Sequence, residues 1–143
     1  MFNQRIKNVM ERRHLLLATA DTTVSAAAKR MAQKKTSAVM VVKDHQLIGI
    51  FTEQDAVVRV MACGLDAQTT PLSAVMTSAP LTIAPDRIFG QALLMMHEKG
   101  CRHIPVVQDG KPVGIVTARK ALDPDMEEFV SETQRRLHLS DVH

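Results

Sequence analysis

The chain carries the same pattern of apolar and polar positions twice, with about 65 residues between the copies. Each copy has apolar side chains at positions i, i+3, i+4 and i+7, which form one face of a helix. These positions are Val24, Ala27, Ala28 and Met31 in the first copy, and Phe89, Ala92, Leu93 and Met96 in the second. The pattern therefore predicts one amphipathic helix in each copy.

A hairpin is predicted after each of these helices. Short apolar runs, SAVMVV and LIGIF in the first copy and HIPVV and PVGIV in the second, flank the polar turns KDHQ and QDGK. Asp-Gly in the second turn is typical of a tight hairpin. Short leading strands are expected near Leu16–Thr19 and Leu81–Ala84, and second helices from Thr52 and Thr117. Each copy thus reads strand, helix, strand, strand, helix, which predicts an α+β fold.

The duplication extends from the pattern to residue identity. A shift of 65 residues, without gaps, aligns Asp21 with Asp86, Lys34 with Lys99, Val41 and Val42 with Val106 and Val107, Asp44 with Asp109, and Gly49 with Gly114. One copy alone buries too little surface to be comfortably stable. We therefore expect two pseudo-twofold-related β-α-β-β-α repeats, packed sheet against sheet, with clefts between them.

The repeats are assigned to residues 10–65 and 75–123, as parts of one compact domain. A Val-Met pair precedes each of them, Val9-Met10 in one case and Val75-Met76 in the other. This pair predicts a short helical lead-in to each repeat.

The tail, residues 124–143, is expected to be a C-terminal helix. Asp123 is a suitable N-cap, and Pro124 suits the first helical position. The helix would carry an apolar stripe made of Met126, Phe129, Val130 and Leu137. We expect this stripe to pack against the domain or against a second subunit.

Charge and composition exclude several functions. The net charge is +3 with a pI near 9.1, which favours an anionic small ligand but does not indicate DNA binding. The densest basic stretch, Arg12–His14, is interpreted as solvated surface. Trp and Tyr are absent, which argues against stacking on nucleic acid. No signal peptide or membrane-spanning run is found, so we expect a cytoplasmic protein without membrane or nucleic-acid partners.

Motifs for catalysis are also missing. The sequence has no Walker phosphate loop, no GxSxG and no HExxH, and its six His residues lack metal-ligand spacing. We therefore expect neither enzymatic activity nor a metal site.

The segment GIFTEQD, residues 49–55, has the chemistry to bind a nucleotide. Thr52 opens a helix, whose free N–H groups favour a phosphate, and Gly49 would let a ligand approach the backbone. Asp55 can accept two hydrogen bonds from a ribose diol. Thr52-x-x-Asp55 also fits a capping box, in which both side chains serve the helix itself. The two roles are compatible, and the residues alone leave both open.

The chain resembles a tandem pair of cystathionine-β-synthase (CBS) domains. GIFTEQD matches that family's Gly-x-x-Thr-x-x-Asp signature completely, whereas GIVTARK, residues 114–120, fails at its last position. RHIPVV and DTTVSAAAKRM also resemble family segments, and the resemblance covers about Met10 to Leu122.

The resemblance implies a regulatory module without catalysis. Such pairs bind adenosine-containing ligands, namely AMP, ADP, ATP, NAD or S-adenosylmethionine, in clefts between the repeats. They commonly form homodimers and transmit a signal to a regulated protein. Because no catalytic or transport domain is attached, that protein is expected to be a separate chain, whose identity is unknown.

By the same resemblance, the chain would have two ligand sites. The first would consist of Ile50, Thr52, Asp55, Thr82, Ile83, Arg102 and His103; the second would consist of Thr19, Ser37, Ala38, Thr117 and Lys120. Arg102 offers a forked donor for phosphate. Lys120 has donors but no acceptor, so it cannot hold a ribose diol as Asp55 can.

We therefore predict that the first site binds the nucleotide and that the second is empty, weak or used differently. Lys120 and Arg119 would then be available for the additional phosphate of NAD or ATP. The alternative function is a CBS-pair dimerisation scaffold that binds no ligand. It would differ from a sensor at Asp55, Arg102 and His103, and the complete first motif favours the sensor.

Overall fold

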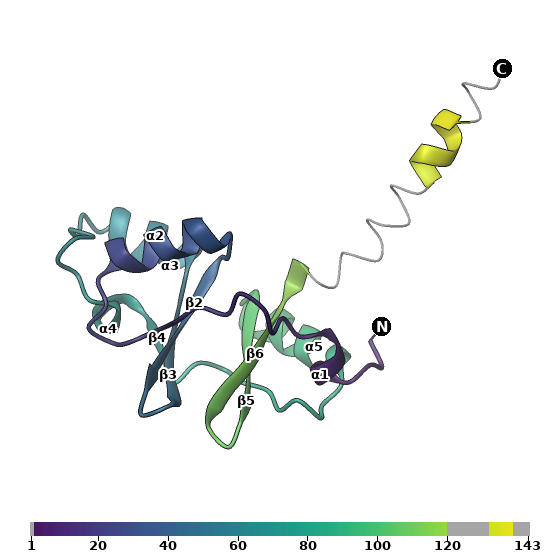
Figure 1. The fold of residues 1–143 in the computed structure, drawn as a ribbon, viewed down its shortest axis with the longest axis horizontal. Coiled ribbons are helices and arrows are strands. Elements are labelled where there is room, and N and C mark those ends of the chain that lie inside the picture. The colour runs from purple at the N-terminus through teal and green to yellow at the C-terminus, as the bar shows by residue number, and fades with distance from the viewer. Residues whose placement is uncertain (1, 120–131, 139–143) are drawn as a thin grey trace.

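The computed structural model describes residues 2–119 and 132–138, and it is built around two β-hairpins, one in each repeat. The hairpins lie side by side in the middle of the molecule, and the helices cover their outer sides (Figure 1). Strands β3 and β6, one from each hairpin, contact each other. This is the α+β arrangement of two repeats that the sequence predicts.

The first repeat contains a four-stranded sheet. Its elements are β1 (Leu17–Ala18), α2 (Val24–Lys34), β2 (Ala38–Lys43), β3 (Gln46–Thr52), α3 (Glu53–Asp55) and a π-helical turn, η1 (Ala56–Met61). The strand order is β1-β2-β3-β4, where β4 (Thr77–Ser78) comes from the segment that follows the repeat. β1 runs parallel to β2, and the other neighbours are antiparallel.

The second repeat has the same arrangement with shorter outer strands. It contains α5 (Phe89–Lys99), β5 (His103–Gln108) and β6 (Lys111–Thr117). The leading strand expected at Leu81–Ala84 is reduced to one parallel bridge from Ile83 to Val106. Pro80 and Pro85, which flank this segment, have no N–H group to extend the ladder. On the opposite edge, Glu11 takes the place of β4 through an antiparallel bridge to Ile115.

Both hairpin turns have the backbone conformation that the Asp-Gly signal predicts. Asp109 and Gly110 have φ values of 53° and 80°, and Asp44 and His45 have φ values of 52° and 64°. Two successive left-handed residues define the type I′ turn, whose twist matches that of the strands. The tips of the two hairpins also meet, because the Leu47 N–H donates to the Gly110 carbonyl at 3.0 Å.

Each lead-in helix packs on one repeat only. The first lead-in helix packs on the second repeat, not on the repeat that it precedes in the sequence. Helix α1 (Ile6–Val9) buries Ile6 and Val9 in the core of the second repeat. Helix α4 (Leu72–Val75) buries its apolar residues in the core of the first repeat. The N-terminus therefore completes the second repeat, and the segment from Glu11 to Leu16 must cross between the repeats.

The predicted helical faces form the two cores. Val24, Ala27 and Met31 belong to one buried cluster; Phe89, Ala92 and Met96 belong to the other. The predicted face is wrong at Ala28, which is exposed, and its counterpart Leu93 is only half-buried. Of the predicted C-terminal helix, residues 132–138 are described and helical, and Leu137 is 61% exposed. Its proposed start at Asp123 and Pro124, and the apolar residues Met126, Phe129 and Val130, lie outside the described residues.

Candidate functional site

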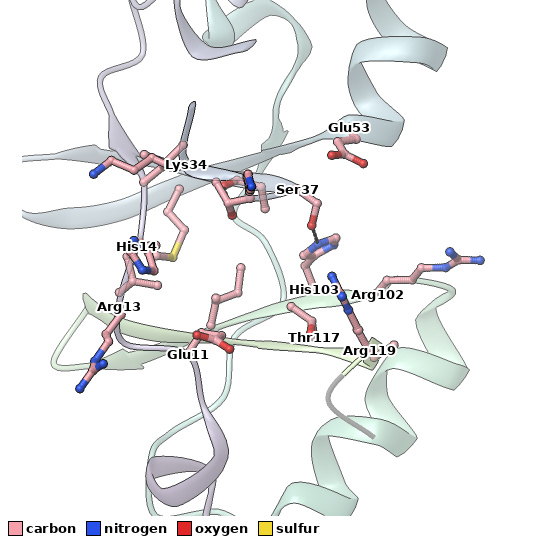
Figure 2. A pocket seen from close by; sticks show the side chains of 18 residues that line it. Glu11, Arg13, His14, Lys34, Ser37, Glu53, Arg102, His103, Thr117 and Arg119 are labelled. Atoms are coloured by element: carbon pink, nitrogen blue, oxygen red, sulfur yellow. Dashed lines mark hydrogen bonds between the residues drawn. The ribbon is translucent and has the colours of Figure 1, made fainter. Parts of the chain in front are cut away.

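A cavity of about 750 Å³ lies between the two repeats. Its walls are Glu11 and Arg13–Leu16 of the crossing segment, the end of α2 with the start of β2, and Glu53 from the first repeat. The second repeat contributes Arg102, His103, Ile115, Thr117, Ala118 and Arg119 (Figure 2). The cavity thus draws on residues that are far apart in the sequence.

Two equivalent backbone junctions bring these walls together. After β3, the Glu53 N–H donates to the Ser37 carbonyl at 3.0 Å; after β6, the Ala118 N–H donates to the Arg102 carbonyl at 3.0 Å. Each junction places the residue before one hairpin strand beside the end of the other strand. The junctions are joined by a hydrogen bond of 2.7 Å between Ser37 Oγ and His103 Nε2, whose donor depends on the imidazole tautomer.

The cavity combines apolar and basic side chains. Leu16, Ala38 and Met40 are buried apolar residues of the lining, and Ile115 is half-buried. The basic side chains of the lining are Arg13, His14, Lys34, Lys35, Arg102, His103 and Arg119, against which stand two acids, Glu11 and Glu53. Within the described residues, none of the Lys and Arg side chains of this set forms an ion pair. The lining therefore favours an amphipathic anion.

The position of His103 favours its neutral form. Burial is the main cause that lowers the pKa of His103 below its ordinary 6.5, and the Arg102 guanidinium lowers it further. Glu53 and Asp55 act in the opposite direction. His103 is thus close enough to the first motif to sense its acids, while it also borders the cavity next to Thr117.

The structure brings three residues of the predicted second site together. Ser37, Ala38 and Thr117 all line the cavity. Thr19 does not, because its exposed hydroxyl donates to Asp21 in the turn before α2. Lys120 lies outside the described residues.

The first motif forms the capping box that its spacing allows. The Asp55 N–H donates to Thr52 Oγ1 at 3.3 Å, and Asp55 Oδ2 accepts from the Thr52 N–H at 2.9 Å and from its hydroxyl at 3.1 Å. The other carboxylate oxygen, Oδ1, lies 3.5 Å from Arg59 Nε. A ribose diol bound at Asp55 would therefore share Oδ2 with the cap or displace Arg59.

The other residues predicted for the first site are distributed around it. Arg102 and His103 line the cavity together with the second-site residues. Ile50 is buried in β3, and Ile83 is buried beneath the bridge to β5. Thr82 is exposed beside it. None of the last three residues lines the cavity.

The role expected for Gly49 is wrong. The space that its missing side chain leaves is filled by Met76, because a Cβ atom at Gly49 would lie 2.4 Å from the Met76 sulfur. Gly114 repeats this arrangement with Met10, whose sulfur would lie 2.5 Å away, and with the Glu11 carbonyl at 3.0 Å. At both glycines the space is occupied by the methionine that directly follows a lead-in helix, and not by a ligand.

Several cavity residues were not predicted from the sequence. Arg13 and His14, interpreted as solvated surface, remain exposed but border the cavity. Arg12 differs from them, since its guanidinium donates to the Lys7 carbonyl at 2.6 Å. Lys34 and Lys35 also contribute from the end of α2. The basic clusters were visible in the sequence, but nothing local shows that they face one another.

The chain belongs to the CBS domain family, whose model matches it twice, over residues 6–62 and 72–124. Over 92 residues it is 44% identical to the meiotically up-regulated gene 70 protein of Schizosaccharomyces pombe, a match that covers 64% of this chain and 13% of that protein. Over 108 residues it is 32% identical to the CBS domain-containing protein CBSCBSPB1 of Arabidopsis thaliana, covering 75% of this chain and 20% of that protein. The chain thus spans a fifth or less of the length of these two relatives.

Solved structures share the fold. An uncharacterized conserved protein from Pyrococcus horikoshii matches with a TM-score of 0.80 and 28% identity, over 87% of this chain and 94% of that one. A CBS domain protein from Pyrobaculum aerophilum, complexed with AMP, matches with a TM-score of 0.74 and 21% identity, over 82% and 89% of the chains. The CBS domain pair of protein MJ0100, in complex with 5′-methylthioadenosine and S-adenosyl-L-methionine, matches with a TM-score of 0.74 and 22% identity, over 82% and 96%.

Two features are absent from the described residues. No helix in this part of the chain is long and apolar enough to cross a membrane. The same residues contain no cluster of three or more His, Cys, Asp or Glu side chains that could hold a metal ion.

Proposed function

We propose that this CBS pair is a non-catalytic regulatory module that binds an adenosine nucleotide between its repeats and transmits the signal to a separate protein. The observation that carries the proposal is the inter-repeat cavity of about 750 Å³. Its volume lies in the range of about 300 to 1,000 Å³ that is typical of small-molecule sites. The ligand would be AMP, ADP, ATP or NAD.

The lining suits the two parts of such a ligand. Leu16, Met40 and Ile115 offer apolar surface to a purine base. Arg102 and Arg119 offer forked donors to phosphate, for which guanidinium geometry is well suited. AMP and S-adenosyl-L-methionine in two CBS structures with this fold support an adenosine ligand.

We also retain the first motif as a ligand site, made of Ile50, Thr52, Asp55, Thr82, Ile83, Arg102 and His103. The support for it is that the carboxylate of Asp55 is 14% exposed and lies close enough to His103 to affect its pKa. In this site Asp55 would hold the ribose, while His103 and Arg102 would face the phosphate.

A homodimer is the expected assembly. Val57, Val58 and Met61 lie on η1, the turn that directly follows the first motif, and are 56%, 53% and 72% exposed. Burying these side chains against a second copy would remove apolar surface from water. Because α3 and η1 are continuous with Asp55, a ligand there would act on this surface, which is the route we propose for the signal.

The test is isothermal titration calorimetry and thermal unfolding with AMP, ADP, ATP and NAD, on wild type and on Asp55→Asn. The amide retains one acceptor for the Thr52 N–H but loses the second acceptor needed for a diol. Asp66→Asn is the matched control, because Asp66 accepts from the Gln68 N–H at 2.9 Å in an exposed turn outside the cavity.

We expect at least one nucleotide to bind. A ligand at about 100 times its dissociation constant adds about 2.7 kcal/mol to the free energy of unfolding. For a chain of this size that raises Tm by about 5 to 11 °C. Asp55 does not line the cavity, so Asp55→Asn should weaken only the binding that takes place at the first motif, and Asp66→Asn should not weaken binding at all. Absence of binding by every nucleotide would contradict the proposal and favour the dimerisation scaffold.

A further inference from the structure

The cavity has basic side chains on two opposite sides. Figure 2 shows Arg13, His14 and Lys34 on one side, and Arg102 and Arg119 on the other. A ligand with two phosphate groups could place one group against each side. The arrangement therefore suits a ligand that carries anionic groups at both of its ends.

The two basic sides have different origins. Apart from Lys34, whose counterpart is Lys99, their basic residues are not repeated at the corresponding positions of the other repeat. The crossing segment that supplies Arg13 and His14 reads Arg-Arg-His-Leu at residues 12–15. The corresponding segment between the repeats, residues 78–81, reads Ser-Ala-Pro-Leu and carries no charge. His14 has a φ of 61°, a left-handed conformation that is uncommon outside glycine. The crossing segment of this cavity thus differs from its counterpart in charge.

The side that holds Arg119 differs from the first motif in the same sense. The first motif ends in Glu53-Gln54-Asp55, whereas the second motif ends in Ala118-Arg119-Lys120. A carboxylate that accepts from a ribose diol would repel a phosphate on the same ribose, and a cation would attract it. Dinucleotide-binding folds use this exchange of acid for base to accept a 2′-phosphate. Arg119, the neighbour of the exchanged position and the counterpart of Gln54, has its side chain in the cavity lining.

We propose that the cavity takes a nucleoside bisphosphate, in which one phosphate is on the 5′ position and another is on the 2′ or 3′ position of the ribose. This inference rests on the proposed adenosine-nucleotide site and assigns to it a nucleotide other than AMP, ADP, ATP or NAD. Arg13 and Lys34 hold one phosphate and Arg102 and Arg119 hold the other, with the apolar lining available to the base. The carboxylates of Glu11 and Glu53 repel the anionic ligand. The basic side chains of the lining are more numerous and outweigh this repulsion.

The test compares two isomers on the full chain at fixed ionic strength. ADP and adenosine 3′,5′-bisphosphate carry the same number of phosphates and differ in where the second one is attached. AMP is the single-phosphate reference, and adenosine 2′,5′-bisphosphate distinguishes the two ribose positions. Isothermal titration calorimetry should show that a bisphosphate binds about tenfold or more tightly than ADP, which is the effect of one charge-assisted contact.

Variants on each side identify the contacts. Arg13→Gln and Lys34→Gln change one side, and Arg119→Gln changes the other. Arg12→Gln and Lys99→Gln are matched controls, because Arg12 bonds to the Lys7 carbonyl and Lys99 is the counterpart of Lys34 in the other repeat. Neither control residue lines the cavity. Variants on both sides should weaken the bisphosphate about tenfold each, while AMP should respond to one side only.

The outcomes separate this inference from the proposed function. If ADP and AMP bind as tightly as the bisphosphates, the inference is overturned and the nucleotide sensor stands. If bisphosphate affinity is unchanged in Arg13→Gln, Lys34→Gln and Arg119→Gln, the assigned contacts are wrong. If no adenosine ligand binds at all, both the inference and the proposed function fail.

Discussion

The two repeats have the same framework and different clefts. Their hairpins, type I′ turns and first helices correspond, and each has a methionine packed over the glycine of its motif. Their motifs end differently: Asp55 closes a capping box, whereas the second motif borders a basic cavity. Core positions are thus apolar in both repeats, while the ends of the two motifs differ in charge.

The largest effect is expected at the two motif glycines. A Cβ atom at Gly114 would meet both the Met10 side chain and the Glu11 carbonyl at 3.0 Å, and this carbonyl is held by the bridge to Ile115. At Gly49 the nearest atoms all belong to the flexible side chain of Met76. Overpacking costs about 1 to 3 kcal/mol. We expect Gly114→Ala to lie near the top of this range and Gly49→Ala near the bottom.

Chemical denaturation of both variants measures this difference. Met76→Ala combined with Gly49→Ala completes a double-mutant cycle, and the smaller side chain should recover part of the loss. Equal destabilisation by the two glycine variants would show that the crossing segment adjusts as easily as the methionine does.

The next effect concerns the cap of the first motif. Thr52→Ala removes the hydroxyl that accepts from the Asp55 N–H and should lower the free energy of unfolding by about 1 kcal/mol. That corresponds to a Tm lower by about 2 to 4 °C. Thr23→Ala is the matched control, since Thr23 caps α2 away from the cavity by accepting from the Ala26 N–H at 3.2 Å.

Ligand binding distinguishes the two variants. Both should lose similar stability, but only Thr52→Ala should weaken nucleotide binding at the first motif. If both bind nucleotide like wild type, the Thr52–Asp55 pair serves the helix alone.

The smallest effect is expected at the bond between the junctions. Ser37→Ala removes the partner of His103 in a half-buried position, at a cost of about 0.5 to 1.5 kcal/mol. Thr36→Ala is a neighbouring control, because its hydroxyl makes only a long contact of 3.5 Å to the Ala38 carbonyl. Thermal unfolding at pH 8 measures the stability of both variants. Similar losses of stability would show that the hydrogen bond between Ser37 and His103 adds nothing measurable.

His103 should also make stability depend on pH. Because burial lowers its pKa in the folded state below 6.5, the unfolded chain binds this proton more readily. The contribution of the neutral imidazole is complete above about pH 6.5 and is lost as the pH falls toward the folded-state pKa. Between pH 7 and 5.5, wild type should therefore lose more stability than His103→Gln does. His97→Gln, at an exposed helix position, should follow wild type.

Much of the fold could be predicted from the sequence because its signals are local. The helical faces around Val24 and Phe89 depend on residues within two turns, and the Asp-Gly turn on two residues. The capping box at Thr52 and Asp55 was also readable, since its two members are three positions apart. By contrast, the wrong role assigned to Gly49 arose because Met76 reaches it from a segment that pairs with β3 only in the folded chain.

By itself the sequence determined the duplication, the elements of each repeat and the exchange of Asp55 for Lys120 between the motifs. Tertiary packing places α1 on the second repeat, which brings Arg13 and His14 to the cavity beside Lys34 and opposite Arg119 (Figure 2). The two kinds of information differ because the residues that determine them lie at different separations along the chain. Periodicity and turn chemistry act between neighbours, whereas the charge of a cleft depends on which distant segments pack against each other to bury their apolar faces.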